Sequence, residues 1–380
     1  MKHILLDFYT NYNLGDDLFA DILMEQFPDC KFDLLSGLRH VPKHMPSNAQ
    51  IHPFSYVNTC IGLLHDRLFH GTALAKPLFS IQQRCRERLI RKADAHIWIG
   101  GSLFMDRGNP EEEIDFATEQ RPVFEFRSTP QALGKSFLIG SNLGPVYHDA
   151  YWAEMRRKFS EYRHVCLRDY ASYLKMRELP HVQYAPDVIF MVKQPEPVDI
   201  GENVVISVID ISSRTGDAAI IDAYYRLLKD TVLEFTGRRI PVTLTSFCKN
   251  EGDENGIDRL LSLLPSRELV SVFRYDGDIP KILSLLSNAT FVVASRFHSM
   301  ILGVAFGKPV FPISYNCKTR HYLHDLDFRG RYSTLEQLPQ TTAADVLYNY
   351  ENRIITDCSL HKTHSRNQFR ALREFLGQDN

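Results

Sequence analysis

The sequence predicts an α/β fold in two domains, and three observations support this. Short apolar runs typical of buried strands alternate with helical patterns along both halves of the chain. The 380 residues suffice for roughly two to three domains of about 150 residues each. A polar stretch with two prolines, residues 193–203, separates the halves. We therefore expect two parallel-sheet domains that face a cleft at the carboxyl ends of their strands.

The first half begins with a βαβ unit. Residues 3–8 indicate a buried strand, residues 18–27 a helix with one apolar stripe, and residues 31–36 a second strand, so parallel pairing follows. Residues 37–76 contain three prolines and are expected to form only loops and short pieces. The other elements expected here are a helix at 77–92, strands at 96–104, 135–145, 164–169 and 182–190, and a helix at 170–179.

The second half restarts the same alternation after the polar stretch. Strands are expected at 203–211, 239–247 and 269–275, helices at 217–235, 256–264 and 278–289, and a strand–turn–helix–strand unit over 290–315. Two helical stretches follow residue 343, the second at about 364–376. We assign residues 1–195 to the first domain, 203–345 to the second, and 346–380 to a helical tail whose last helix could cross back to the first domain.

Composition excludes several classes of protein. The 44 Lys and Arg against 46 Asp and Glu give a net charge of −2, which argues against global attraction to nucleic acid. The seven cysteines include no CxxC pair, as expected for reduced thiols rather than a disulfide framework. No apolar run approaches the roughly 18 residues of a membrane-spanning helix, and the N-terminal run is too short for a signal peptide. We expect a cytoplasmic protein.

Polar and glycine residues follow several predicted strands of the first domain. The loop after the first strand carries Asn13, Asp16 and Asp17, which would suit either a capped helix start or a hydroxyl-rich sugar ligand. Two later strands end in glycine loops, one with Gly100 and Gly101 and one containing Asn142. Glycines at such positions would let a ligand approach the backbone closely.

The segment from Ser295 to Ser299, SRFHS, is the most distinctive of the chain. It places Arg296 and His298 where a buried strand becomes a helix. Arginine suits carboxylate and phosphate oxygens, and histidine is the usual proton carrier near neutral pH. A satisfied interior histidine is the alternative. The segment predicts an anion site with a proton donor.

Two further cations end predicted strands. Arg168 could point into the cleft or form a surface ion pair with Asp169 or with a nearby helix. Lys318 lies just beyond a strand of the second domain, where it could contact an anion or remain solvated. Together with Arg296, these residues would concentrate positive charge locally in a chain that is nearly neutral overall.

Six segments, in order, resemble the polysaccharide pyruvyl transferase family. They are NYNLGDD, IGGSLF, GSNLGP, LRDYAS, APDVIF and SRFHSMILGVAFGKPVFPISYNCK, and they cover most of residues 1–325. The resemblance implies a GT-B-type architecture of two Rossmann-like domains. It also implies transfer of the enolpyruvyl unit of phosphoenolpyruvate onto two hydroxyls of one sugar, giving a pyruvate ketal and phosphate. Neither metal, nucleotide nor other cofactor is implied. In bacterial relatives the acceptor belongs to an exopolysaccharide, capsule or cell-wall polymer precursor.

This resemblance suggests roles for the candidate residues. His298 would be the general acid, and Arg296, Arg168 and Lys318 would hold phosphoenolpyruvate, with the donor on the second domain. The first domain would bind the glycan acceptor. The other residues expected to bind substrate are Ser295, Ser299, Asp16, Asp17, Asn13, Gly100, Gly101 and Asn142.

The segment 37–95 matches nothing in the family pattern and is expected to shape acceptor specificity. Its helix 77–92 is strongly basic, with Arg84, Arg86, Arg88, Arg91 and Lys92. This helix could be an ordinary solvated face, or it could contact the inner face of the membrane if the acceptor is lipid-linked. Two other functions suit the same architecture: a GT-B glycosyltransferase that uses a nucleotide sugar, and a catalytically silent sugar-binding protein.

Overall fold

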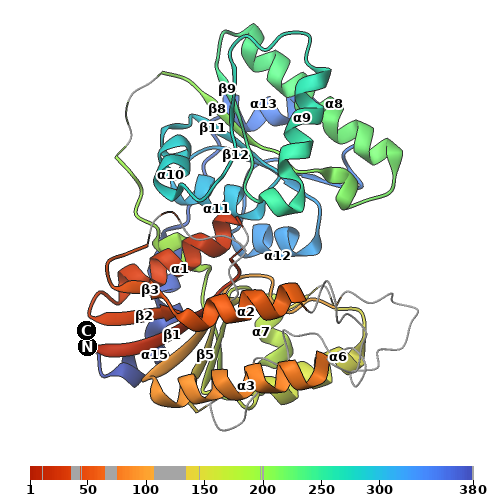
Figure 1. Ribbon diagram of the computed structural model, residues 1–380. Helices are drawn as coiled ribbons and strands as arrows, with labels where there is room; N and C mark the ends of the chain where they lie inside the picture. The colour runs from red at the N-terminus through yellow and green to blue at the C-terminus, as the bar shows by residue number, and fades with distance from the viewer. Residues whose placement is uncertain are drawn as a thin grey trace. The chain divides into compact units, whose positions relative to one another are not determined.

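The computed structural model describes residues 1–10, 12–35, 43, 45–64, 75–106, 134–144, 146–196, 198 and 201–378. The chain divides into two compact units, each with its own sheet (Figure 1). The first unit comprises Met1–Thr10, Asp16–Val188 and His364–Asn380, and the second comprises Asn11–Gly15 and Ile189–Thr363. The predicted two-domain α/β fold is thus confirmed.

The first unit contains a seven-stranded, fully parallel sheet of order β3-β2-β1-β4-β5-β6-β7. Its strands are β1 (Lys2–Asp7), β2 (Cys30–Leu34), β3 (Ala49–Ile51), β4 (Ala95–Ile99), β5 (Ser136–Ser141), β6 (His164–Leu167) and β7 (Val182–Tyr184). Its helices are α1 (Leu14–Gln26), α2 (Pro53–Leu64), α3 (Ala75–Lys92), α6 (Asp149–Phe159), α7 (Tyr170–Met176) and α15 (Arg370–Leu376). All six residues of β5 are buried, as expected for a central strand covered on both faces.

The second unit contains a six-stranded parallel sheet of order β10-β9-β8-β11-β12-β13. The strands are β8 (Val204–Ser207), β9 (Val242–Thr245), β10 (Val270–Phe273), β11 (Phe291–Ala294), β12 (Val310–Ser314) and β13 (Ser333–Thr334). The helices are α8 (Ala218–Gly237), α9 (Asp253–Leu263), α10 (Ile279–Asn288), α11 (Phe297–Ala305), α12 (Cys317–Asp325), α13 (Ala343–Glu351) and α14 (Ser359–Ser365), the last of which ends in the first unit.

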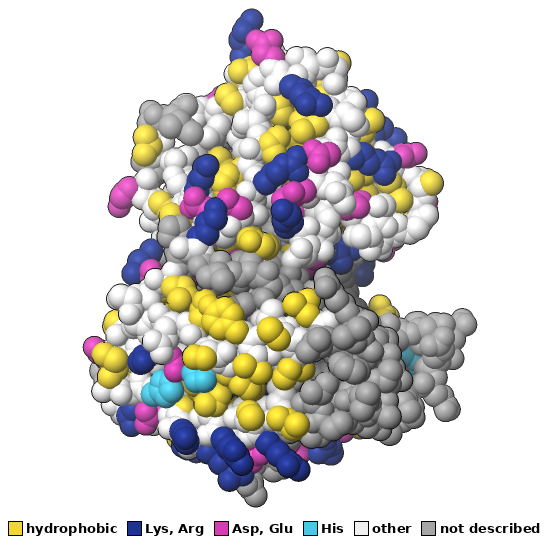
Figure 2. Space-filling model, viewed as in Figure 1, with side chains coloured by type: hydrophobic (Ala, Val, Ile, Leu, Met, Phe, Trp, Pro, Cys, Tyr) yellow, Lys and Arg dark blue, Asp and Glu magenta, His cyan; other side chains and the backbone are white. Residues whose placement is uncertain are grey.

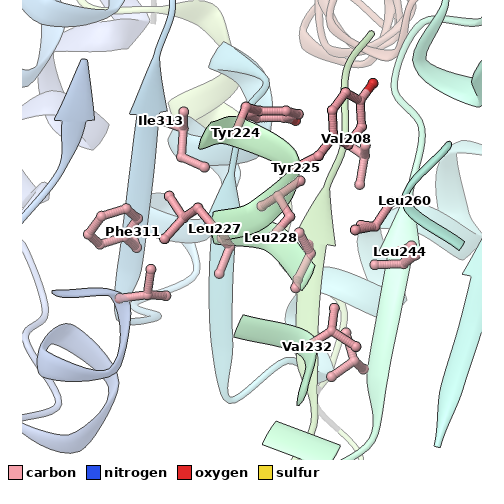
Figure 3. Packing of buried hydrophobic residues seen from close by; sticks show 14 of the residues in the cluster. Val208, Tyr224, Tyr225, Leu227, Leu228, Val232, Leu244, Leu260, Phe311 and Ile313 are labelled. Atoms are coloured by element: carbon pink, nitrogen blue, oxygen red, sulfur yellow. The ribbon is translucent and has the colours of Figure 1, made fainter. Parts of the chain in front are cut away.

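Helix α8 supplies much of the core of the second unit (Figure 3). Leu228 and Val232 lie four residues apart, so they share one face of the helix. Both belong to one buried cluster that also contains the strand residues Leu244, Phe311 and Ile313. This close-packed apolar layer supports the carboxyl edge of the sheet, where the candidate site residues begin.

The prediction that residues 37–76 form only loops and short pieces is wrong. This stretch contains β3 and the twelve-residue helix α2. The misinterpreted residue is Pro53, which begins α2 instead of breaking a pattern. Proline is favoured at the first position of a helix, because its missing N–H would have no intrahelical partner there.

The boundary between the units differs from the predicted linker. Contacts divide the chain at Val188 and Ile189, whereas the linker was placed at 193–203. The polar stretch packs on α10: Ser287 Oγ donates to the Pro195 carbonyl at 2.8 Å, and Val198 N donates to Asn288 Oδ1 at 2.7 Å. Polar composition alone therefore does not separate a linker from a surface strap.

The predicted tail also divides differently. Helix α13 belongs to the second unit, and the chain returns to the first unit at His364. Gln368 anchors the return, because its side chain accepts a hydrogen bond from Gly140 N at 3.0 Å and donates to the carbonyl of Ala185 at 2.7 Å. The last helix therefore completes the first unit. Within the described residues, no helix has the length and apolarity to cross a bilayer.

Candidate functional site

His298 lies at the carboxyl edge of the six-stranded sheet. β11 ends at Ala294 and α11 begins at Phe297, so the imidazole projects from the first turn of a helix. The ring of Phe297 contacts that of His298 edge-on, with centroids 5.2 Å apart. The first N–H groups of a helix have no intrahelical acceptor and carry partial positive charge. His298 is therefore set beside an anion-favouring helix end.

Gly15 packs directly against His298. A Cβ built on Gly15 would fall 1.7 Å from His298 Nδ1, so only glycine leaves room for the imidazole. The short segment Asn11–Gly15 groups with the second unit. It is held there by Leu14 N, which donates to the Phe247 carbonyl at 2.9 Å, and by a backbone bridge to Cys248. Gly15 thus allows the backbone of this segment to approach the His298 side chain closely.

Arg296 is engaged by two carboxylates. Its Nε donates to both Asp253 oxygens at 3.0 Å, and its two terminal nitrogens bind Asp253 and Glu251. Asp253 also accepts hydrogen bonds from Phe247 N and Cys248 N at 2.8 and 2.9 Å. The loop that holds the Gly15 segment is thereby tied to Arg296.

Arg214 completes this charged group by binding Glu251. Burial of Glu251 opposes its ionisation, but Arg296 and Arg214 outweigh that effect and lower the pKa of Glu251 to about 2. Two arginines and two carboxylates leave no net charge in the group. Arg296 was expected to hold the anionic donor, but its guanidinium is already bound by two carboxylates of the protein.

Both serines of the SRFHS segment, Ser295 and Ser299, are buried. Ser295 Oγ accepts a hydrogen bond from the Tyr224 hydroxyl at 2.9 Å, and Ser295 N and Arg296 N donate to Ser207 Oγ at 3.0 and 3.2 Å. These bonds fix the turn between β11 and α11. Ser299 is fully buried in the first turn of α11, and its hydroxyl has no hydrogen-bond partner among the described residues.

Lys318 and His298 contact the same aromatic ring. The Lys318 Nζ is 4.8 Å from the ring centroid of Phe297, the ring that also contacts His298. Lys318 stands in the first turn of α12, whose N-cap Asn316 accepts a hydrogen bond from Thr319 N at 2.9 Å. Lys318, a cation in the first turn of α12, therefore contacts the same Phe297 ring as His298.

A second polar network occupies the first unit. Arg168 is almost fully buried and donates to Asp187 at 2.9 Å and to Asn142 Oδ1 at 2.7 Å. A Cβ on Gly101 would lie 2.6 Å from the guanidinium, so this glycine admits the arginine. Asp169 caps α7 by accepting from Ser172 N at 2.8 Å. The alternative considered for Arg168, a surface ion pair with Asp169, is therefore not what forms: the arginine is buried and pairs with Asp187.

Asp16 joins this network from the first turn of α1. Its Oδ1 accepts a hydrogen bond from Gly101 N at 3.4 Å and lies 3.3 Å from where a Cβ of Gly100 would stand. Ser102 Oγ donates to Asn142 Oδ1 at 3.1 Å. Asp17, in the same helical turn, is also buried. The structure thus gathers Asp16, Gly100, Gly101, Asn142 and Arg168 in one network.

Six further candidates lie in the second unit. They are Asn13, Ser295, Arg296, His298, Ser299 and Lys318. Asn13 Oδ1 accepts from Gly15 N at 3.1 Å, so it shapes the turn that presents the glycine. Among the described residues, no group of three or more His, Cys, Asp or Glu side chains is arranged to hold a metal ion.

Sequence reasoning missed the partners of the two buried arginines. These are Glu251 and Asp253 for Arg296, and Asp187 for Arg168. A signal for the first two existed, because an acidic stretch, KNEGDEN, begins at Lys249, shortly after β9 ends at Thr245, and so lies near the carboxyl edge of the same sheet as His298.

Together, the two parallel-sheet units define a GT-B-type protein, the class to which the similar solved structures belong. HepE of Anabaena, in complex with UDP and glucose, is 12% identical, with 100% of both chains covered and a TM-score of 0.53. A UDP-N-acetylglucosamine 2-epimerase assigned in Listeria monocytogenes is 9% identical, with 100% of this chain and 97% of that chain covered and a TM-score of 0.60. The Neisseria meningitidis UDP-GlcNAc 2-epimerase is 10% identical over 100% of both chains, with a TM-score of 0.54.

A family match is more specific than these fold likenesses. Residues 13–316 match the polysaccharide pyruvyl transferase family, and the chain belongs to it. The matched region begins at Asn13, beside the glycine that packs on His298, and ends at Asn316, the N-cap of the helix that carries Lys318. No curated protein matches the chain significantly.

Proposed function

We propose that the protein transfers the enolpyruvyl group of phosphoenolpyruvate onto two hydroxyls of a sugar in a polysaccharide or its precursor, forming a pyruvate ketal and releasing phosphate. Family membership supports the transferase class. The observation that carries the specific proposal is the position of His298. It is held against Gly15 at a helix start, and Lys318 contacts the same Phe297 ring as His298. This arrangement combines a proton donor with positive charge.

The donor would be recognised by its negative charge. A phosphate monoester carries about −1.5 to −2 charges at neutral pH, and phosphoenolpyruvate adds a carboxylate. Lys318 and the N–H groups at the start of α11 are the sources of positive potential beside His298. The buried Ser299 hydroxyl lies in the same turn. Because Arg296 is bound by Asp253 and Glu251, we assign it a positioning role.

His298 would act as the general acid. Its imidazolium donates a proton to the methylene carbon of the enol, and one sugar hydroxyl adds to the adjacent carbon and loses its proton. The bond from that carbon to the phosphate oxygen then breaks, phosphate leaves, and the second hydroxyl closes the ketal as its own proton departs. General acid–base assistance of this type contributes roughly 10²–10⁴-fold in rate.

Acceptor recognition is proposed for the first unit. Asp16, Asp17 and Asn142 offer carboxylate and amide groups, which pair well with sugar hydroxyls. Arg168 would act indirectly, because its bonds to Asn142 and Asp187 fix the orientation of the amide. The reaction as written needs neither metal nor cofactor, so chelation should leave turnover unchanged.

Acceptor-dependent phosphate release tests the proposal. Wild-type protein is mixed with phosphoenolpyruvate and a panel of glycan acceptors, and His298→Gln is compared with His324→Gln, whose side chain is 92% exposed on α12. We expect His298→Gln to lose about 10²-fold or more in turnover while its thermal unfolding stays within a few degrees of wild type. The control should match wild type. Near-normal turnover by folded His298→Gln would reject the assignment.

Product analysis separates this function from the alternatives. A nucleotide-sugar glycosyltransferase would release nucleotide from a nucleotide sugar and ignore phosphoenolpyruvate. A silent sugar-binding protein would release neither product. Stabilisation by phosphoenolpyruvate should grow with RT ln(1 + [L]/Kd), and a thermal shift seen with uridine nucleotides alone would favour the glycosyltransferase.

A further inference from the structure

Helix α2 exposes an apolar face. Tyr56, Val57 and Leu63 are 55%, 49% and 53% exposed, and with the exposed Cys60 they recur at three- and four-residue spacing along one side of the helix. Among the described helices, α2 alone exposes three large apolar side chains. Pro53–Leu64 contains no charged residue. The outward face of α2 is thus unlike a solvated helix surface.

The exposed face of the neighbouring helix α3 begins with an apolar residue and is basic along the rest of its length. Ile81 is 58% exposed, and Arg84, Arg88 and Lys92 follow on the same side at three- and four-residue spacing, all exposed. The sequence of α3 contains six cations and a single acid, Glu87. Glu87 binds Arg91, and Arg86 turns inward to bind the buried Asp7. The exposed Arg84, Arg88 and Lys92 therefore give the C-terminal part of α3 a positively charged surface.

The two helices form one surface. Gln82 Nε2 on α3 donates to Asn58 Oδ1 on α2 at 2.5 Å, and Phe54 and Ile90 share a buried cluster beneath them. Figure 1 shows α2 and α3 on the same face of the first unit. Figure 2, in the same view, shows hydrophobic side chains gathered over this face and Lys and Arg side chains along its lower edge.

We propose that this α2–α3 face binds the surface of an anionic lipid bilayer. Exposed apolar side chains on charge-free α2 would enter the boundary between headgroups and acyl chains, and the basic end of α3 would meet anionic headgroups. Long, flexible arginines spread along an edge suit a diffuse negative surface better than a fixed set of acidic partners. The surface lies on helices outside the candidate site, so the proposal goes beyond the proposed function.

Vesicle flotation with the full chain tests the proposal. Wild-type protein should float with vesicles that contain phosphatidylglycerol, float much less with pure phosphatidylcholine, and be released by high salt. Arg84→Glu/Arg88→Glu and, separately, Val57→Ser/Leu63→Ser should each reduce the bound fraction about tenfold. Thermal unfolding of each variant should remain close to wild type, because all four side chains are exposed.

The matched control is Arg156→Glu/Arg157→Glu on α6. This helix of the same unit also ends in basic residues, but its arginines pair with Glu154, Glu161 and Glu178. The control should float like wild type. Equal flotation of all variants would overturn the proposal, as would absence of wild-type binding or equal binding to neutral vesicles. A wild-type dimer that Val57→Ser/Leu63→Ser converts to a monomer would show instead that a second copy covers the face.

Discussion

Gly15 and His298 are in such close contact that a Cβ on the glycine would overlap the imidazole, 1.7 Å from Nδ1. The glycine follows the first strand of one unit, yet it belongs by its contacts to the second. Asn13 and Leu14 hold its loop through bonds to Gly15 itself and to Phe247. The orientation of the proposed general acid therefore depends on a residue far from it in sequence.

Replacing Gly15 by alanine should displace the imidazole. The added methyl group cannot be accommodated unless His298 moves, and overpacking of this kind typically costs about 1–3 kcal/mol. We expect Gly15→Ala to retain its fold and to lose about 10²-fold in acceptor-dependent phosphate release. Steady-state kinetics and thermal unfolding provide the two measurements.

The matched control for this variant is Gly216→Ala. A Cβ on Gly216 meets nothing within 4 Å, so turnover and melting temperature should stay at the wild-type values. If Gly15→Ala turned over substrate as fast as Gly216→Ala, the contact would have no bearing on catalysis.

Removing the carboxylate of Asp253 should destabilise the second unit strongly. Asp253→Ala leaves the buried Arg296 without its main partner and frees two backbone N–H groups, those of Phe247 and Cys248. Breaking a buried pair by removing one member typically costs about 3–5 kcal/mol. Urea unfolding should show a loss of this size, and the double variant Asp253→Ala/Arg296→Met should recover part of it. A loss below about 1 kcal/mol would mean that the pair is not buried as described.

The sequence predicted most strands of both units, because buried parallel strands are continuous apolar runs. It missed β3 and β13, which have only three and two residues. It placed His298 correctly at the end of a strand, since a strand that runs directly into a helix leaves little freedom in register. The sequence did not predict the ion pairs of the two buried arginines. Asp187 lies 19 residues from Arg168, and Asp253 lies 43 residues from Arg296. Such partners are selected by the fold. The acidic stretch after β9 indicates that carboxylates lie at the same edge of the sheet as His298, but it does not show which of them bind Arg296.

The sequence also failed to predict helix α2, and for a different reason. Its exposed and buried sides are both apolar or uncharged, so the segment lacks the amphipathic period that normally reveals a surface helix. Pro53, the one clear signal, was interpreted as a breaker. An exposed apolar face can thus hide a helix from pattern analysis, because it removes the alternation of apolar and polar sides that a solvated surface helix shows.

Acid should weaken the fold partly through Glu251. Its pKa is lowered from 4.5 to about 2, so its stabilising contribution is complete above pH 4.5 and disappears as the pH falls toward 2. Urea midpoints measured between pH 6 and pH 3 should fall less steeply for Glu251→Gln than for wild type. Glu234→Gln, which changes an exposed carboxylate of α8, should follow the wild-type curve. Parallel curves for wild type and Glu251→Gln would contradict this source of acid sensitivity.

Substitution of Gln368 should loosen the first unit, although this residue lies near the end of the chain. Its buried amide binds Gly140 N and the carbonyls of Ala185 and Pro186. Gln368→Ala leaves these backbone groups without a partner in the interior, which typically costs about 1–3 kcal/mol. Arg370→Ala, which removes an exposed bond to Gln183 two residues along the same tail, should cost less than about 0.5 kcal/mol. Calorimetry should show the lower melting temperature in Gln368→Ala alone. Equal melting of both variants would mean that the C-terminal return merely lies on the first unit without stabilising it.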